Sequence, residues 1–141
     1  MATREADGLK QAPYHGDEGN KSLWYGEFAK SGVAQNDLIR MCVIPAGSFV
    51  TDMDFIFDDC GTTVTCDVGY EPVNSADGPS AVEDFWLAAV AVATAAGRSR
   101  SAAHAIRFEY DVYVTVKAEA AGFTGSPKIA VVASGEYQGT K

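Results

Sequence analysis

The chain has 141 residues, of which 47% are hydrophobic and 21% are charged, which fits one globular domain with a single core. Its formal net charge of −8 gives a surface that a phosphate backbone repels, so we expect no nucleic-acid partner. The longest apolar stretch, 85–96, is too short to cross a bilayer, and the N-terminus has no signal-peptide pattern, so we expect no membrane partner and synthesis in the cytoplasm.

Residues 1–21 are polar and interrupted by glycine and proline, which predicts an extended N-terminal arm outside the core. Two states stay open for this arm: disorder in the isolated chain, or order on a partner. Leu9 and Tyr14 stand there among charges and would suit a shallow groove or an added strand on another protein. We therefore take both as candidate partner-binding residues, and we place the folded domain at 22–141.

From residue 22 onward, apolar and polar residues alternate, which predicts β-strands with one buried face. The pattern predicts one long strand over 106–118, a strand over 48–57 and another over 63–70. In 48–57 it assigns Phe49, Met53, Phe55 and Phe57 to the inner face and Val50, Asp52, Asp54 and Ile56 to the outer face. The residues expected in one core are Phe49, Phe55, Phe57, Val64, Val68, Phe108, Val112, Val114 and Val116.

Short turns separate these strands and predict hairpins between antiparallel neighbours, at 45–47 and at 58–61. Ser80 and Glu83 have the spacing of a capping box, and Gly97 can end a helix, so a short helix is expected over 81–88. Residues 88–96 suit either a continued helix or a buried strand. A last strand is expected near 128–137.

Seven or eight antiparallel strands with one short helix predict an all-β fold, an antiparallel β-sandwich of jelly-roll type. No internal repeat is visible in the sequence.

No set of residues in the sequence predicts catalysis, so we expect no enzyme activity. His15 lies in the arm, and His104 begins a strand without a nucleophile or a carboxylate at a recognisable spacing. The spacing of Cys60 and Cys66 does not fit a zinc site, and three cysteines do not suggest a disulfide framework.

The best metal candidate is an acidic group at the end of one predicted strand, Asp52, Asp54, Asp58 and Asp59, whose carboxylates would suit calcium. Aspartates that alternate along a strand ordinarily indicate a face exposed to solvent. We therefore expect no metal and no cofactor.

Some apolar residues fall on predicted outer faces, which favours a binding role. Val50 and Ile56 lie beside the aspartates of 48–57, and Tyr113 stands between charges on the wet face of 106–118. We take these three as further candidate partner-binding residues. Coverage of such a face by the helix, by the arm or by another chain stays open.

Two segments resemble the cementing (decoration) proteins of tailed-bacteriophage capsids. Residues 39–50, IRMCVIPAGSFV, resemble their strand–PAG–strand opening, and residues 61–70, GTTVTCDVGY, resemble the strand that follows. Asp84-Phe85 before a small-residue stretch also fits, and the length is similar to that of the cementing protein of a Bordetella podovirus. The resemblance covers roughly residues 37–97.

The resemblance implies a jelly-roll protein that forms a small homo-oligomer, a dimer or trimer. It implies that this oligomer staples neighbouring subunits of the major capsid protein on the outer surface of a virion, after synthesis in the host cytoplasm. It implies no catalytic residue. The alternative is a receptor- or carbohydrate-binding sandwich of a phage tail, in which Trp24, Trp86 and the tyrosines would supply stacking faces.

Overall fold

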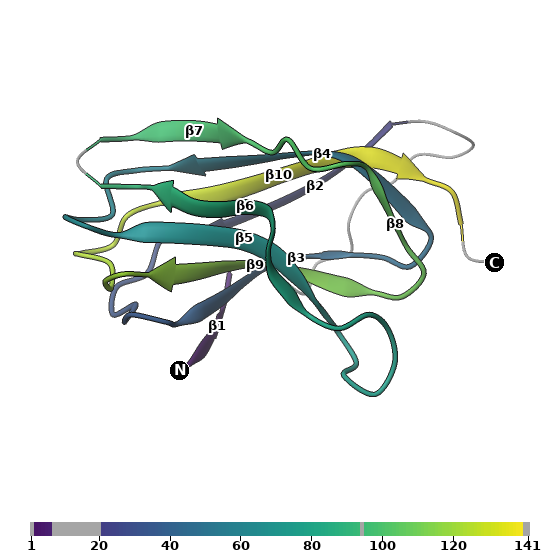
Figure 1. Ribbon diagram of the computed structural model, residues 1–141, viewed down its shortest axis with the longest axis horizontal. Helices are drawn as coiled ribbons and strands as arrows, with labels where there is room; N and C mark the ends of the chain where they lie inside the picture. Colours follow the sequence, from purple (N-terminus) through teal and green to yellow (C-terminus); the bar gives the residue numbers. More distant parts are fainter. Residues whose placement is uncertain (1, 7–20, 94, 140–141) are drawn as a thin grey trace.

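The computed structural model describes residues 2–6, 21–93 and 95–139, and in this part of the chain ten strands form two packed sheets without a helix (Figure 1). Sheet A has the order β1-β3-β9-β5-β6, formed by β1 (Thr3–Glu5), β3 (Leu38–Ile44), β9 (Val112–Glu119), β5 (Thr65–Pro72) and β6 (Val82–Ala91). Sheet B has the order β2-β10-β4-β7, formed by β2 (Lys21–Phe28), β10 (Ile129–Tyr137), β4 (Ser48–Phe57) and β7 (Gly97–Arg100), and β8 (Ile106–Phe108) also pairs with β4.

One hydrophobic core fills the space between the sheets. Trp24, Met53 and Phe55 reach it from sheet B, and Ile39 and Val114 reach it from sheet A. Of the nine residues expected in the core, eight are buried there, and only Phe49 is half-buried. The all-β sandwich is therefore confirmed as an arrangement of two sheets over one core.

The two predicted hairpins are wrong, because their turns join strands of different sheets. The turn at 45–47 leads from β3 in sheet A to β4 in sheet B, and the turn at 58–61 leads back to β5 in sheet A. Gly47 turns the chain with a φ of 87°, a backbone region that glycine enters without steric cost. A turn signal in the sequence marks a reversal, but it does not say whether the next strand pairs with the last or crosses the core.

The predicted long strand at 106–118 is two strands in two sheets. β8 pairs with β4 in sheet B, and the chain then bends at 109–111 and continues as β9 in the middle of sheet A. The apolar residues keep their two-residue spacing through the bend, and Phe108 and Val112 are both buried, but Tyr110 between them is exposed where a single strand would have turned it inward. A corner between two sheets therefore has the sequence pattern of one strand.

A β-bulge reverses the predicted faces of the first half of β4. Val50 pairs with Gly135 and Asp52 pairs with Ser134, so Thr51 is an extra residue without a partner in the ladder. Because of this extra residue, Val50 points into the core, 1% exposed, and Phe49 points outward. From Met53 onward the predicted faces are correct.

The predicted helix is also wrong, because residues 82–91 form strand β6 at the edge of sheet A. β6 pairs with β5, but it advances five residues from Val82 to Leu87 while β5 advances two from Val68 to Tyr70. The bulged backbone of β6 lies directly over Gly69, where a side chain would meet the carbonyl groups of Val82 and Glu83. Tertiary pairing with β5 therefore overrides the local capping signal at Ser80.

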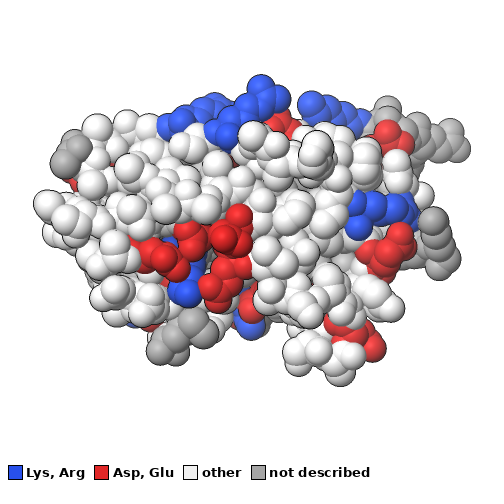
Figure 2. Space-filling model, viewed as in Figure 1, with Lys and Arg blue, Asp and Glu red and all other residues white. Residues whose placement is uncertain are grey.

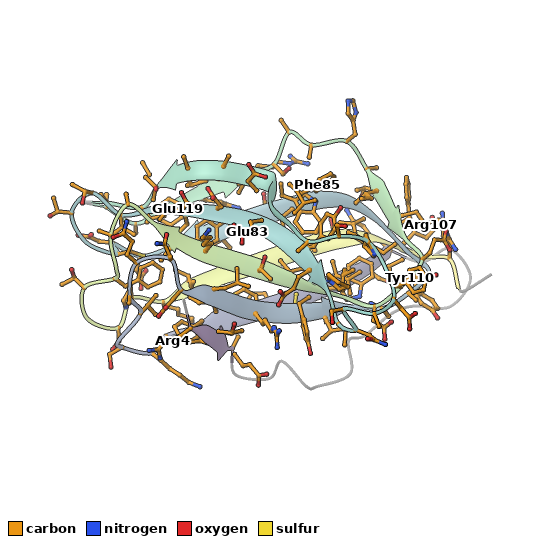
Figure 3. The ribbon with its side chains drawn as sticks, turned by 60° about the horizontal axis from the view of Figure 1, so that its bottom comes forward. Arg4, Glu83, Phe85, Arg107, Tyr110 and Glu119 are labelled. Atoms are coloured by element: carbon orange, nitrogen blue, oxygen red, sulfur yellow. The ribbon has the colours of Figure 1, made fainter. Side chains whose placement is uncertain are left out.

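The N-terminal segment begins with a strand that docks on its own domain. β1 pairs in parallel with β3, and Asp37 accepts hydrogen bonds from the backbone N–H groups of Ala2 and Ala34, at 3.1 and 3.0 Å. Arg4, a residue of β1 that is labelled in Figure 3, forms an ion pair with the same carboxylate at 3.4 Å. These contacts lower the pKa of Asp37, chiefly through the Ala34 N–H group.

Candidate interaction surfaces

The described residues contain no cluster of histidine, cysteine and carboxylate side chains that could hold a metal ion. His104 is exposed in the segment between β7 and β8, and His15 lies outside the described residues. The remaining candidates for a binding surface are the two outer faces of the sandwich and its cavities.

The three cysteines are free and buried. Burial raises the pKa of Cys42 and of Cys60 to about 12 and raises that of Cys66 as well. A thiol with such a pKa is almost entirely protonated at neutral pH, so these side chains serve as small apolar groups of the core.

The four aspartates considered for calcium point to separate partners. Asp52 receives two hydrogen bonds from Arg100, at 3.0 and 2.8 Å, and Asp54 forms an ion pair with Arg98 at 2.6 Å. Asp58 accepts a hydrogen bond from the Lys128 N–H group, and Asp59 accepts one from the Gly61 N–H group. The aspartates thus fasten β7 to β4 and shape a turn, and the basic side chains of β7 line the edge that is uppermost in Figure 2.

The outer face of sheet B changes from apolar to charged across its strands. Tyr25 on β2 pairs with Val132 on β10, and Val132 pairs with Asp54 on β4. Leu23 and Tyr25 are 53% and 50% exposed although both are large and apolar. The apolar residues on this face, which we call the β2–β10 patch, are Leu23, Tyr25, Ala130, Val132 and Ile56.

The outer face of sheet A is polar and carries paired charges. Arg40 forms an ion pair with Glu71 at 2.5 Å, and its guanidinium group stacks over the ring of Tyr113, 4.6 Å from the centroid. Lys117 lies between Glu83, at 2.8 Å, and Glu119, at 3.5 Å. Tyr113 is therefore half-covered by a neighbour of its own chain.

An acidic group surrounds Lys117 on the same face. Figure 2 shows acidic side chains gathered over this part of sheet A, and Figure 3 labels Glu83 and Glu119 there. Asp67 accepts a hydrogen bond from the Ala89 N–H group at 2.7 Å. Burial raises the pKa of Asp67, and the nearby carboxylates of Glu119 and Asp84 raise it further, whereas the Ala89 N–H group lowers it.

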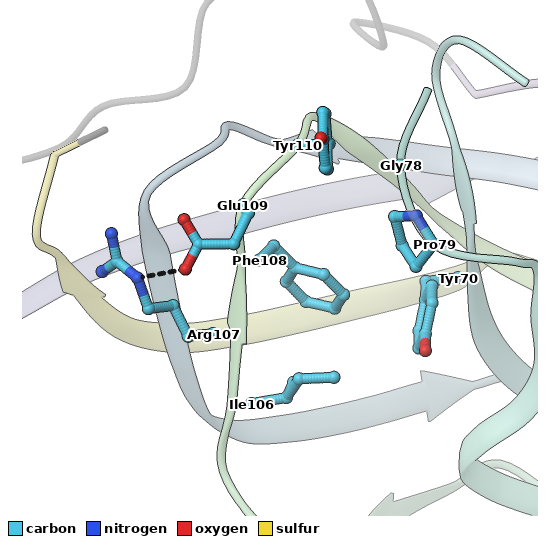
Figure 4. Close-up of a pocket in the computed structure, with 8 residues that line it drawn as sticks. All are labelled: Tyr70, Gly78, Pro79, Ile106, Arg107, Phe108, Glu109 and Tyr110. Atoms are coloured by element: carbon cyan, nitrogen blue, oxygen red, sulfur yellow. Dashed lines mark hydrogen bonds and ion pairs between the residues drawn. The ribbon is translucent and has the colours of Figure 1, made fainter. Parts of the chain in front are cut away.

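A cavity of about 360 Å³ opens at the bend between β8 and β9 (Figure 4). Phe108 and Tyr70 form its wall, with ring centroids 5.0 Å apart in an edge-to-face arrangement, and Tyr110 stands at its rim. Arg107 and Glu109 pair with each other at 2.9 Å, to one side of the rings in Figure 4. The cavity is mainly apolar and lies at the lower end of the size range of small-ligand pockets.

The predicted partner-binding residues do not form one site. Val50 is in the core, so its predicted outward position is wrong, and Leu9 and Tyr14 lie outside the described residues. Ile56 is half-buried on the outer face of sheet B, and Tyr113 is half-buried on the outer face of sheet A. The stacking faces expected of Trp24 and Trp86 are also absent, because both side chains are buried.

Leu23 and Tyr25, the most exposed part of the β2–β10 patch, are not among the partner-binding residues predicted from the sequence. The signal was present in residues 21–28, KSLWYGEF, because a buried tryptophan between them forces both neighbours outward in a strand. The run Leu-Trp-Tyr is apolar at every position, so the sequence alone does not say which of the three side chains face inward. The burial of Trp24 decides it.

No helix in the described part of the chain is long and apolar enough to cross a membrane.

The similarity of this chain to known proteins is a similarity of fold. No protein-family model matches it, and no curated protein sequence matches it. Its fold is similar to that of a chain in the capsid of Ralstonia phage GP4, with a TM-score of 0.76 and 21% identity, covering 99% of this chain and 100% of that one. It is also similar to chains in the capsid asymmetric unit of cyanophage Pam1 (TM-score 0.61, 21% identity, 87% of this chain and 89% of that one) and in the acid-stable capsid of Helicobacter pylori bacteriophage KHP30 (0.59, 15%, 88% and 91%).

Proposed function

We propose that this chain is a non-enzymatic structural protein of a bacteriophage virion, a cement that binds the major capsid protein on the outer surface of the shell. The observation that carries this proposal is the similarity to the Ralstonia phage capsid chain, which extends over nearly all of both chains. Similar folds in two further phage capsids support the same assignment.

The proposal includes a sandwich of jelly-roll type. From β2 to β5 the chain changes sheet at every step, β6 remains beside β5, and the remaining strands return to sheet B, cross to β9 and end in β10. The resulting orders, β2-β10-β4-β7 against β3-β9-β5-β6, support two interleaved Greek keys.

The physical properties of the surface suit a cement. Surface charges such as Arg98 and Asp54 pair within the chain. Of the large apolar side chains that are exposed in the described residues, Leu23 and Tyr25 lie side by side in the β2–β10 patch, whereas Val73 and Tyr110 lie elsewhere. A protein that binds only the assembled lattice stabilises that lattice by mass action, and no chemistry is required of it.

The test is addition of the purified protein to capsids that were assembled without it. We expect saturable co-sedimentation and a higher melting temperature for the loaded capsids than for the empty ones. Binding to the isolated capsid subunit as strong as binding to the lattice, or no binding to either, would contradict the proposal.

The arm of residues 1–21 is proposed to strengthen retention on the capsid. A tethered segment binds at high effective concentration once its domain is docked. We expect deletion of residues 2–20 to weaken retention on capsids. Because β1 is part of this segment, Asp37→Ala serves as the control: it removes the acceptor that holds Ala2 and Arg4 but leaves the arm in place. Equal retention of the truncated and full-length proteins would contradict a role for the arm.

The second candidate is a receptor- or carbohydrate-binding module, and the cavity beside Tyr110 is the observation that favours it. Glycan binding that is lost in Tyr110→Ala, without any binding to capsids, would favour this function over the cement.

A further inference from the structure

Strand β2 lies at the edge of sheet B and pairs with β10 on one side only (Figure 1). Within the described ranges, no backbone hydrogen bond joins its other side to another segment. Its inner face rests on sheet A, where Gly26 touches the backbone of Met41. The strand has eight residues, so it presents a long row of backbone donors and acceptors for another strand.

The middle of β2 lacks the features with which natural proteins protect an edge strand. The strand contains no proline, its pairing with β10 runs without a bulge, and its middle is Leu-Trp-Tyr. The exposed side chains at its centre are Leu23 and Tyr25, and the charged residues stand near its ends, at Lys21 and Glu27. An exposed, regular and apolar edge of this kind is typical of strand pairing with another chain.

The outward side chains of β2 are complementary to themselves in one antiparallel register. A two-fold axis through Trp24 places Leu23 opposite Tyr25 of a second copy, and it places Lys21 opposite Glu27 of that copy. By symmetry each pair occurs twice, so all four cross-strand pairs on the outer face join two apolar side chains or a cation and an anion. Moving the axis to residue 23 sets Lys21 against Tyr25, and moving it to residue 25 sets Leu23 against Glu27.

Glu27 is part of a small polar network, and Lys21 of the second copy would join this network. Its carboxylate accepts a hydrogen bond from the Tyr25 hydroxyl at 2.8 Å and lies 3.2 Å from Lys128 Nζ. In the register centred on Trp24, the added Lys21 approaches this network from the side of β2 that faces away from β10.

We infer that β2 joins two copies of this chain into a two-fold dimer, with the two β2 strands antiparallel and centred on Trp24. Sheet B then continues across the axis, and the β2–β10 patches of both copies form one apolar surface. The inference rests on the proposed function, because a small homo-oligomer is what the resemblance to capsid cements implies, and it names the surface that would join the copies. The dimer is tested on the isolated protein, whereas the proposed function is tested by binding to capsids. A negative result for the dimer therefore does not decide whether the protein binds capsids.

Engineered disulfides test the register directly. Opposite residues in an antiparallel pair have Cα atoms about 4.5–5.5 Å apart, within the range of a disulfide, whereas diagonal neighbours are about 7–8 Å apart and outside it. We expect a mixture of Leu23→Cys and Tyr25→Cys chains to form a disulfide-linked pair, and neither variant alone to do so. The native cysteines are buried and do not interfere.

Charge reversal supplies a second measurement that needs no covalent bond. Lys21→Glu sets glutamate against Glu27 of the other copy, and Glu27→Lys sets lysine against Lys21, so we expect each variant to dimerise about tenfold more weakly. Mixing the two variants restores opposite charges in both pairs and should restore the wild-type dissociation constant. Sedimentation of a wild-type monomer at high concentration, or a cross-link of either cysteine variant with itself, would overturn the inference.

Discussion

The carboxyl group of Asp67 lies on the outer face of sheet A, where its pKa is higher than that of an ordinary aspartate. Burial and the carboxylates of Glu119 and Asp84 raise its pKa. The folded protein therefore binds this proton more tightly than the unfolded chain does. The free energy of unfolding falls as pH rises from the ordinary carboxyl pKa, about 3.9, to the raised pKa, and the penalty is fully present above it.

Asp67→Asn should remove this penalty and keep the hydrogen bond from the Ala89 N–H group, since an amide oxygen can accept it. We expect the variant to exceed the wild type in stability by up to about 1 kcal/mol at neutral pH, and the difference to shrink as pH falls through the raised pKa. Denaturant unfolding of both proteins across this pH range measures it. Asp67→Ala leaves the Ala89 N–H group without its acceptor and should instead be destabilised at every pH. If the stability gain of Asp67→Asn did not depend on pH, the raised pKa of Asp67 would not be its cause.

At the scale of single strands, the bulge in β4 depends on a glycine in its neighbour. A Cβ atom on Gly135 would lie 2.9 Å from the Val50 Cα atom and would overlap the carbonyl group of Phe49. Because these are backbone atoms, they cannot turn aside as a flexible side chain could. Gly135 therefore permits the close approach that brings Val50 into the core.

We expect Gly135→Ala to lower the free energy of unfolding by about 1–3 kcal/mol, because the bulge must shift to admit the methyl group. The neighbouring Ser134→Ala adds no atom to the backbone contact and serves as the control, with an expected loss below about 1 kcal/mol. Thermal or denaturant unfolding of both variants measures the effect, and equal losses would show that the close approach is not the cause.

The same strands show how far the sequence predicts the fold. Alternation identified the buried apolar residues of β5 and β9 correctly, because a two-residue period survives wherever a strand is regular. It did not predict that Asp67 and Thr115, on the opposite faces of these strands, are also buried. It failed at Val50 and over 82–91, where bulges insert extra residues whose positions depend on the partner strand. It also could not assign strands to sheets, since the turn at 45–47 is equally suited to a hairpin and to a crossing over the core.

The candidate surface was less predictable than the core. Ile56 was placed on the correct face, but Leu23 and Tyr25 were missed. Their exposure follows from the place of β2 at the edge of sheet B, and the order of strands in a sheet is a property of the whole chain. Charge pairs such as Arg100 with Asp52 were hidden for the same reason, because their residues lie far apart in the sequence.

At the scale of the whole molecule, the two sheets should unfold together. The chain crosses repeatedly between them, and one core contains side chains from both, including Trp24 from sheet B and Trp86 from sheet A. Separating the sheets would expose the apolar inner face of each, so neither has a stable structure alone.

The two tryptophans allow this cooperativity to be measured sheet by sheet. In Trp86→Phe the remaining Trp24 reports on sheet B, and in Trp24→Phe the remaining Trp86 reports on sheet A. Each substitution should lower stability by about 1–3 kcal/mol, since both side chains are buried. Within each variant, however, tryptophan fluorescence and far-UV circular dichroism should give the same unfolding midpoint, because the two probes follow one transition. A fluorescence midpoint that departs from the circular dichroism midpoint in either variant would mean that one sheet persists after the other has unfolded.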